Sequence, residues 1–357
     1  MRTAALSPLA EGESNPAVDG LGRYLEFQLR HQFLTVTVPM SIILMAANII
    51  RGYRDAIERF TIWIWGPDVL LGGVALAVFL AAPVMLRWIW RTRPLEPGPL
   101  RARLEAHCRR IGLRVREILV WDSGGMMVNA AVMGILAPIR FVLLSDSLLR
   151  TLPIEQVEAV FGHEAGHVRH RHIQHLLIFA FLGWLIVAGI MEGLAQTLQN
   201  PASSMEMTLT VIQGVGIAVT ILFWGVGFGW LSRRFERQAD AFGAWCVTPP
   251  GGQCQAPCSV HNGSTKADPP EHRVCATGAA VFASALRRVA QLNGIPPEER
   301  SWRHSSIASR IRFLTAMAAD PRRAEHFHRD IRRWKVASTT LAAFGSVAAL
   351  AYGILMF

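Results

Sequence analysis

The sequence predicts a mostly α-helical membrane protein, with about five transmembrane helices and a polar α+β domain that contains a small sheet. Composition is the first indication: 51% of the 357 residues are hydrophobic and only 17% are charged, which is too apolar for an ordinary soluble protein with one core. The second is that apolar residues fall in runs long enough to cross a bilayer. The third is a polar region between these runs, whose short apolar segments are typical of strands.

The long apolar runs are expected to span the membrane, because they are almost free of charged residues. A buried core helix is the alternative for each run. The predicted organisation is an N-terminal tail over 1–31, a transmembrane hairpin over 32–90, a polar domain over 91–335 and a C-terminal transmembrane helix over 336–357. The polar domain is interrupted by a second transmembrane hairpin over 173–231 and by an insertion over 247–275.

The basic residues predict the orientation of the chain. Net charge is +10, and almost all of the cations are arginines. Lysine and arginine are dense over 87–110, 233–237 and 322–335, and they are absent from the link 200–206 inside the second hairpin. Such an excess is typical of cytoplasmic segments. We therefore expect a multi-pass protein of the cell (inner) membrane, with the lipid bilayer as its partner and the polar domain in the cytoplasm.

Three segments of the polar domain are predicted strands, because they are apolar or β-branched and are bounded by turn residues. They cover residues 117–121, 126–133 and 140–144. Thr151-Leu152-Pro153 then predicts the start of a helix, since proline is favoured in the first helical turn.

This helix carries the segment His163-Glu164-Ala165-Gly166-His167. Two histidines four residues apart lie on one helix face and can reach the same zinc ion, while the glutamate between them contacts a water on that ion as a general base. The motif alone is also compatible with an exposed helix that carries two unliganded histidines. The nearby His170, His172 and His175 are expected to be bystanders at the membrane interface.

Glu236 is the predicted third ligand, because a catalytic zinc ion usually takes three ligands from the protein. His167 precedes the hairpin over 173–231 by about as many residues as Glu236 follows it. If the hairpin is antiparallel, both side chains lie at the same depth. Asp240, one turn beyond Glu236, is placed to accept a hydrogen bond from a ligand histidine. An exposed, charged helix end is the alternative.

Together these motifs resemble those of the HtpX-like and CAAX-prenyl-protease-type integral-membrane zinc metallopeptidases. The segments that carry the resemblance are Asn129-Ala130, the run 152–172, Glu236-Arg237-Gln238-Ala239-Asp240, and His304 with Arg310. They are similar, in this order, to the family's substrate strand, metal-binding helix, second metal motif and late histidine-arginine motif. Ser305 stands where a proline is common. The similarity extends over 100–246 and 276–316.

The resemblance implies a zincin-like (gluzincin) metallopeptidase domain with one catalytic Zn²⁺. It assigns zinc binding to His163, His167 and Glu236, general-base catalysis to Glu164, stabilisation of the oxyanion or ordering of the site to His304 and Arg310, and binding of the substrate backbone to Asn129 and Ala130. The implied function is a membrane-embedded zinc metalloendopeptidase that hydrolyses peptide bonds of membrane or misfolded proteins. Proteins and peptides are therefore its expected substrates.

Two other classes of protein are alternatives. A catalytically inactive, zinc-stabilised membrane scaffold would keep the ligands, but it would not need the base Glu164. A membrane-tethered nucleic-acid binder would use the arginines, but no recognised binding motif accompanies them, so no nucleic-acid partner is expected. The sequence carries no signal for an oligomeric state or for the processing of prenylated peptides.

The insertion over 247–275 interrupts the family pattern and has four cysteines in or beside it. Cys254, Cys258 and Cys275 could hold a second ion, but their irregular spacing matches known zinc sites poorly. A loop without metal is therefore the favoured interpretation. A disulfide between Cys246 and Cys275 is the alternative in an oxidising compartment.

Overall fold

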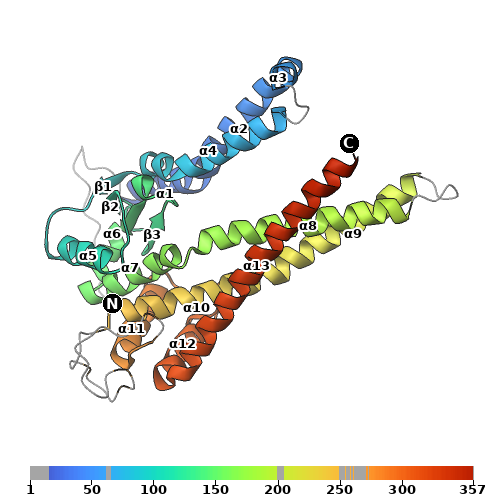
Figure 1. Cartoon of the computed structure of the whole chain (residues 1–357). Helices are drawn as coiled ribbons and strands as arrows, with labels where there is room; N and C mark the ends of the chain where they lie inside the picture. Colours follow the sequence, from blue (N-terminus) through green and yellow to red (C-terminus); the bar gives the residue numbers. More distant parts are fainter. Residues whose placement is uncertain are drawn as a thin grey trace, which may run out of the picture. The chain divides into compact units, whose positions relative to one another are not determined.

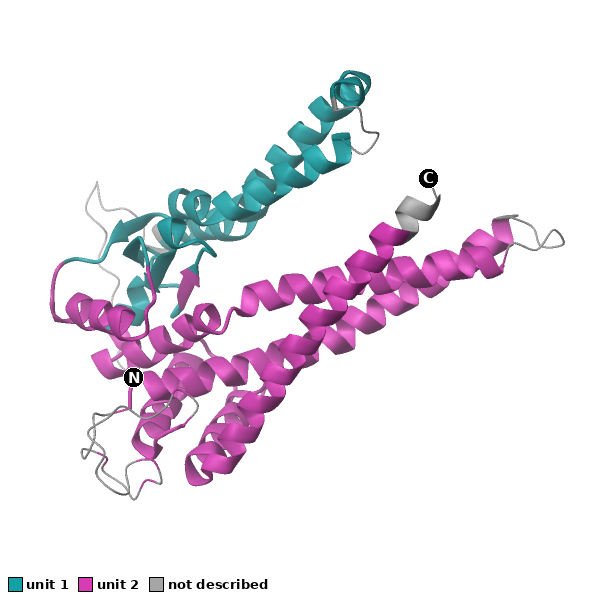
Figure 2. Cartoon of the chain, viewed as in Figure 1, with its two compact units in different colours: residues 1–96, 115–129, 133–150 teal, residues 97–114, 130–132, 151–357 magenta. Residues whose placement is uncertain are grey.

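A computed structural model of the chain describes residues 16–61, 66–198, 205–248, 254, 258, 260, 271 and 273–356. The chain divides into two compact units (Figure 2). Unit 1 comprises residues 1–96, 115–129 and 133–150, and unit 2 comprises residues 97–114, 130–132 and 151–357. Each unit is therefore assembled from segments that are separated in the sequence.

Unit 1 begins with a long helical segment and a returning helix (Figure 1). Its helices are α1 (Pro16–Gln28), the π-helical stretch η1 (Leu29–Leu34), α2 (Thr35–Gly52), α3 (Arg54–Thr61), α4 (Gly66–Ile89), the 3₁₀ turn η2 (Ala137–Ile139) and α6 (Asp146–Thr151). The helices α2 and α4 pack against each other, as the expected hairpin over 32–90 requires. Helical structure already begins at Pro16, inside the expected N-terminal tail.

The described strands form one four-stranded sheet. They are β1 (Thr92–Pro94), β2 (Glu117–Trp121), β3 (Ala130–Met133) and β4 (Phe141–Ser145), in the order β1-β2-β4-β3. β2 and β4 are parallel, and both are apolar and almost entirely buried, as central parallel strands usually are. β1 was not expected from the sequence. It pairs antiparallel with β2 at the edge of the sheet, where its terminal Pro94 is tolerated.

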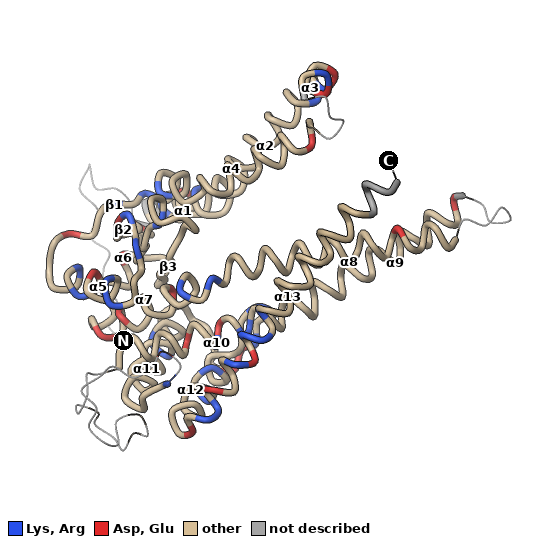
Figure 3. The backbone as a smooth tube through the Cα atoms, viewed as in Figure 1, with Lys and Arg blue, Asp and Glu red and all other residues tan. Residues whose placement is uncertain are grey.

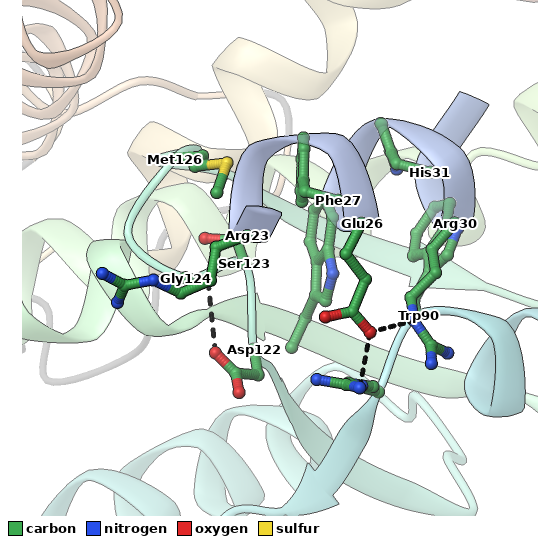
Figure 4. Close-up of a pocket in the computed structure, with 12 residues that line it drawn as sticks. Arg23, Glu26, Phe27, Arg30, His31, Trp90, Asp122, Ser123, Gly124 and Met126 are labelled. Carbon is green, nitrogen blue, oxygen red and sulfur yellow. Dashed lines mark hydrogen bonds and ion pairs between the residues drawn. The ribbon is translucent and has the colours of Figure 1, made fainter. Parts of the chain in front are cut away.

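An aromatic cluster and a small cavity lie together in unit 1. The rings of Trp90 and Trp121 stack with their centres 4.9 Å apart, and they line a cavity of about 200 Å³ (Figure 4). Glu26 projects into this cavity, where it pairs with Arg30 at 2.9 Å and with Arg91 at 2.5 Å. One wall of the cavity is thus formed by the ion pairs of Glu26, and the other by Trp90 and Trp121, which pack in the hydrophobic core of unit 1.

Unit 2 consists mainly of helices. They are α5 (Pro99–Arg110), α7 (Ile154–Arg169), α8 (His172–Thr197), α9 (Met205–Leu222), the π-helical stretch η3 (Phe223–Phe228), α10 (Gly229–Cys246), α11 (Ala276–Leu292), α12 (Ile307–Ala319) and α13 (Pro321–Met356). α8 packs against both α9 and α13 (Figure 1). α9, η3 and α10 follow one another without a break, so the chain passes from the second hairpin directly into the helix of Glu236.

Among the described residues, four helices are long and apolar enough to cross a membrane: Gly20–Gly52, Gly66–Ile89, His172–Thr197 and Glu206–Cys246. They contain the expected spans of both hairpins. Residues 336–356 of the expected fifth span, 336–357, form the last part of α13; residue 357 lies outside the described residues, and the fifth span remains a prediction. The charged residues of α13 are confined to its first half (Figure 3). The prediction of a mostly helical chain with several candidate membrane helices and a small sheet is confirmed.

Candidate metal centre

Close packing of α7 on α10 forms the framework of the site. A Cβ atom added to Gly162 would lie 2.8 Å from Cβ of Cys246, and one added to Gly166 would lie 3.1 Å from Cα of Ala239. Larger side chains at these two positions would push the helices apart. The two glycines therefore allow α7 to approach the face of α10 that carries Glu236.

This approach brings His163 and His167 of α7 next to Glu236 of α10. The Nε2 atoms of the two histidines are 3.3 Å apart. Oε2 of Glu236 lies 3.7 Å from Nε2 of His163, and Oε1 of Glu236 lies 3.6 Å from Nε2 of His167. The structure thus brings the three predicted ligands together, with the second hairpin between them in the sequence.

These separations fit a zinc ion. Donor atoms placed tetrahedrally at bonds of about 2.1 Å lie about 3.4 Å from one another. The separation of 3.3 Å between the two nitrogens is close to that value, and so are the 3.6 and 3.7 Å from each nitrogen to one of the two oxygens of Glu236. Two imidazoles and one carboxylate also form a ligand set of catalytic zinc sites, which keep a fourth position open. The chemistry and the geometry of the residues therefore both suit Zn²⁺.

Asp240 lies between a ligand histidine and a buried arginine. Its side chain is fully buried, and its Oδ1 lies 2.9 Å from Nδ1 of His163. Arg310 of α12 donates to both carboxylate oxygens, with its Nε at 2.8 Å. Burial opposes a positive charge on His163, but the carboxylates of Asp240 and Glu236 outweigh this effect and raise its pKa. Asp240 thus lies beside His163, and its role in supporting a zinc ligand remains a prediction.

Arg310 and His304 also approach Glu236. Nη2 of Arg310 lies 3.8 Å from Oε2 of Glu236, and Nδ1 of His304 lies 3.1 Å from the same oxygen. The side chain of Arg310 is 10% exposed, whereas that of His304 is 48% exposed. Both residues therefore lie next to Glu236. Arg310 is almost buried, whereas His304 is accessible from solvent.

Glu164 lies next to the first ligand and against strand β3. The backbone N–H of Val132 hydrogen-bonds to its carboxylate. Burial raises the pKa of Glu164 to about 7, in spite of the nearby His163. A carboxyl group with a pKa near neutrality can both accept and release a proton at physiological pH, which is the property of an efficient general base.

His172, expected to be a bystander at the membrane interface, is instead buried and contacts His167, a predicted ligand. Arg171 adopts a left-handed conformation, with φ 55° and ψ 41°, which is uncommon for a residue other than glycine. The resulting break between α7 and α8 lets Nδ1 of His172 lie 2.9 Å from Nδ1 of His167. No sequence signal for this turn is evident, because neither glycine nor asparagine occurs there.

The contact with His172 extends into a chain of hydrogen bonds. Nε2 of His172 lies 3.0 Å from Oε1 of Gln238, which also accepts from Nζ of Lys335 at 3.1 Å. Burial, and then the charge of His163, lower the pKa of His167 to about 4. A neutral His167 that donates from Nδ1 to His172 keeps the lone pair of its Nε2 free for a metal ion.

The predicted substrate-binding residues lie at the start of β3. Asn129 belongs to unit 1, where its N–H donates to Oγ of Ser145 at 3.0 Å and its carbonyl accepts from the N–H of Ser145 at 2.9 Å. Ala130 is the buried first residue of the strand. The roles of Asn129 and Ala130 remain predictions.

A half-buried ion pair connects α5 to α7, the helix that carries His163 and His167. Nε and Nη2 of Arg103 each lie 2.6 Å from an oxygen of Glu158, and Nε2 of His107 lies 3.2 Å from the same carboxylate. Glu158 is 4% exposed. Burial opposes its charge, but His107 and Arg103 outweigh that effect and lower its pKa.

Comparison with known proteins adds three findings. A sequence profile of Peptidase family M48 matches residues 95–318. The chain is 27% identical to a protease HtpX homolog of Aeropyrum pernix over 292 residues, which cover 73% of this chain and 88% of that protein. It is also 27% identical to CAAX prenyl protease 1 of Saccharomyces cerevisiae over 130 residues, which cover 36% of this chain and 29% of that protein.

A solved structure shares the fold. The crystal structure of S. mikatae Ste24p superposes with a TM-score of 0.53 over 82% of this chain and 66% of that chain, at 17% sequence identity. At this identity the likeness concerns the fold alone. The profile, in contrast, covers well over half of the chain and includes α7, α10 and α12, the helices that carry the metal group.

Proposed function

The chain belongs to peptidase family M48, and from this premise we propose that it is a zinc metalloendopeptidase of the cell (inner) membrane. The observation that carries the proposal is the convergence of His163, His167 and Glu236, whose ligand atoms lie within 4.8 Å of one another. Glu164, adjacent to the first of these ligands, would be the general base.

His163, His167 and Glu236 would hold the zinc ion. When bound, the ion would act as a Lewis acid that polarises the scissile carbonyl and lowers the pKa of water at the site toward neutrality. Asp240 and His172 engage the Nδ1 atoms of the two histidines, so that both rings offer Nε2 as the ligand atom.

Glu164 would accept the proton of the attacking water on its carboxylate and deliver it to the nitrogen of the leaving amine. Its pKa of about 7 suits both steps, since the group can be charged when it accepts the proton and neutral when it donates it. The N–H of Val132 holds the carboxylate in place.

His304 and Arg310 would stabilise the negative charge that develops on the carbonyl oxygen. His304 is half-exposed and can reach a bound peptide, whereas Arg310 is fixed by Asp240 and contributes a permanent positive charge. A charge that is already in place costs no reorganisation when the transition state forms.

The substrate would bind as an extended strand along β3. This strand is at the edge of the sheet, and an edge strand can pair with a peptide through main-chain hydrogen bonds. Asn129 directly precedes the strand, Ala130 is its first residue, and Val132 adjoins Glu164, the proposed base. Because main-chain pairing depends little on side chains, it suits membrane or misfolded proteins of varied sequence.

The basic segments support a cytoplasmic position for the peptidase domain. Alkaline phosphatase, which is active only outside the cytoplasm, is expected to be inactive when inserted at the exposed Gly294 between α11 and α12. High phosphatase activity at that site would contradict the orientation.

Cleavage of casein by the full-length protein in detergent tests the mechanism. Glu164→Gln is expected to lower kcat/KM by at least about 10²-fold, because the base is lost, and to leave the zinc content unchanged. Glu155→Gln, on the exposed face of the same helix, is the matched control and is expected to keep its activity. Cleavage by Glu164→Gln at the wild-type rate would contradict the mechanism. Stoichiometric zinc in a wild-type protein that cleaves nothing would instead favour the scaffold.

A further inference from the structure

Three cysteine sulfurs converge where the chain enters α11. Sγ atoms of Cys254, Cys258 and Cys275 all lie within 4.8 Å of one another. Cys275 is the residue that precedes the first turn of α11. The cluster is separate from the His163 group, and it is formed by residues that the proposed peptidase mechanism does not use.

The spacing of the sulfurs suits a metal ion better than a disulfide. Sγ of Cys254 lies 3.4 Å from Sγ of Cys275, well beyond the length of a disulfide bond, which is about 2.05 Å. Thiolates placed tetrahedrally around Zn²⁺ at about 2.3 Å lie about 3.8 Å apart. The sulfurs are therefore close to the arrangement that one ion would require.

The surroundings of the cluster favour thiolate sulfur. The backbone N–H of Ala276, in the first turn of α11, donates to Sγ of Cys258 at 3.5 Å. Oγ1 of Thr277 lies 3.0 Å from Sγ of Cys254. The amide of Ala276 stabilises sulfur that carries negative charge, the hydroxyl of Thr277 can donate in the same way, and the start of a helix adds the positive end of its dipole.

Burial makes a cation necessary if these groups are to be ionised. Cys258 and Cys275 are almost completely inaccessible to solvent. Buried thiolates without a partner would be costly. A divalent ion bonded directly to the sulfurs removes that cost, because a coordinated thiol loses its proton.

We propose that Cys254, Cys258 and Cys275 bind a second, structural Zn²⁺ ion, with one further donor in the fourth position. Binding is not a redox step. Each of the three thiols gives up its proton to solvent and forms a bond to the ion, so the oxidation states of sulfur and zinc do not change. From its spacing the sequence favours a loop without metal, but spacing alone does not reveal that the three sulfurs meet.

The proposed ion would secure the start of α11 beside the helix of the catalytic ligand. A Cβ atom on Gly278 would lie 2.3 Å from the carbonyl oxygen of Ala244, and one on Gly243 would lie 2.4 Å from Phe282. α11 therefore packs tightly on α10, which also carries Glu236 (Figure 1). The role of the ion would be to fix the insertion to this helix pair.

Zinc stoichiometry of the full-length protein tests the proposal, after purification in detergent under reducing conditions. We expect ~2 zinc ions per wild-type chain, ~1 for Cys258→Ala, ~1 for His163→Ala/His167→Ala, and almost none for the combined variant. Cys108→Ala, which removes a buried cysteine of α5, is the matched control and should keep both ions. The two sites are thus read separately, so a failure of the peptidase proposal does not affect this one.

The proposal is overturned if Cys258→Ala binds as much zinc as the wild-type protein. Cobalt provides a second measurement that requires no cysteine variant. Co²⁺ loaded into the His163→Ala/His167→Ala protein should give the intense near-ultraviolet charge-transfer absorption of cobalt thiolates, and zinc should abolish it. Absence of this absorption, with the protein folded by circular dichroism, would also overturn the proposal.

Discussion

At the scale of single residues, Asp240 links His163 to Arg310. It contacts the outer nitrogen of His163 and forms a paired interaction with Arg310, and all three groups are buried or nearly so. Removing one partner of such a buried pair leaves an uncompensated charge, at a cost of about 3–5 kcal/mol. The three residues therefore compensate one another's charge, and Asp240 is also placed to support His163 as a predicted zinc ligand.

His172 is expected to support His167 in the same way. His172→Ala removes the acceptor for Nδ1 of His167, so we predict that zinc affinity falls about 10–100-fold. Competition with a chromogenic chelator measures this affinity. His175→Ala, one turn further along α8, is the matched control. Equal affinities of the two variants would show that the contact has no effect on the metal.

Helix packing determines the site at the scale of elements. The ligands lie on α7 and α10, so a small increase in the distance between these helices separates the imidazoles from the carboxylate. Gly162 is a point of contact at which a methyl group has no space, since its Cβ would lie 2.8 Å from that of Cys246. Adding a single methyl group at Gly162 is therefore expected to move α7 away from α10.

Gly162→Ala is therefore predicted to lower zinc affinity and to reduce the free energy of unfolding by about 1–3 kcal/mol, the usual cost of overpacking. Gly189→Ala is the control, because no atom lies within 4 Å of the added Cβ in α8. Thermal unfolding and chelator competition measure the two effects. A variant at Gly162 that binds zinc as well as the control would argue against the close approach.

The ion pair between Arg103 of α5 and Glu158 of α7 is expected to make a pH-dependent contribution to the stability of the fold. The pKa of Glu158 is lowered in the folded protein, so its charged form stabilises the fold above its ordinary pKa of 4.5. This stability is lost as the pH falls through the lowered value. Glu158→Gln should reduce the unfolding free energy by about 1–3 kcal/mol at pH 7.

Thermal unfolding of the wild type and of Glu158→Gln across pH checks the direction of this effect. The difference in Tm should shrink as the pH falls below 4.5, because Glu158 then takes up a proton in the unfolded chain while it is still charged in the folded protein. The contribution is fully lost once the pH is below the lowered pKa of the folded protein. The groups that face it are Arg103 and His107 of α5 and Glu155 of α7. A constant difference at all pH values would mean that the charge of Glu158 does not contribute.

At the scale of the whole molecule, the hairpin explains how much of the site could be predicted from the sequence. His163 and His167 follow from helix periodicity, and Glu236 follows from a hairpin that returns the chain to the same depth. The sequence does not predict His172, because its position depends on the left-handed turn at Arg171. The sequence also does not predict that Cys254, Cys258 and Cys275 converge, because this depends on the path of the chain before α11.

The same limit applies to strands and helix irregularities. The apolar strands β2 and β4 are evident from their composition, and both are found within one residue of the predicted bounds. β1 is too short and too basic to be recognised, because only its pairing with β2 defines it. The π-helical stretches η1 and η3 likewise carry no distinct residue pattern.

Anomalous diffraction at the zinc edge, from crystals of the Glu164→Gln protein, tests the central claim most directly. We predict a peak about 2.0–2.2 Å from Nε2 of His163, from Nε2 of His167 and from a carboxylate oxygen of Glu236. A protein with stoichiometric zinc that shows no peak there, or a peak with Glu236 turned away from it, would contradict the metal centre described above.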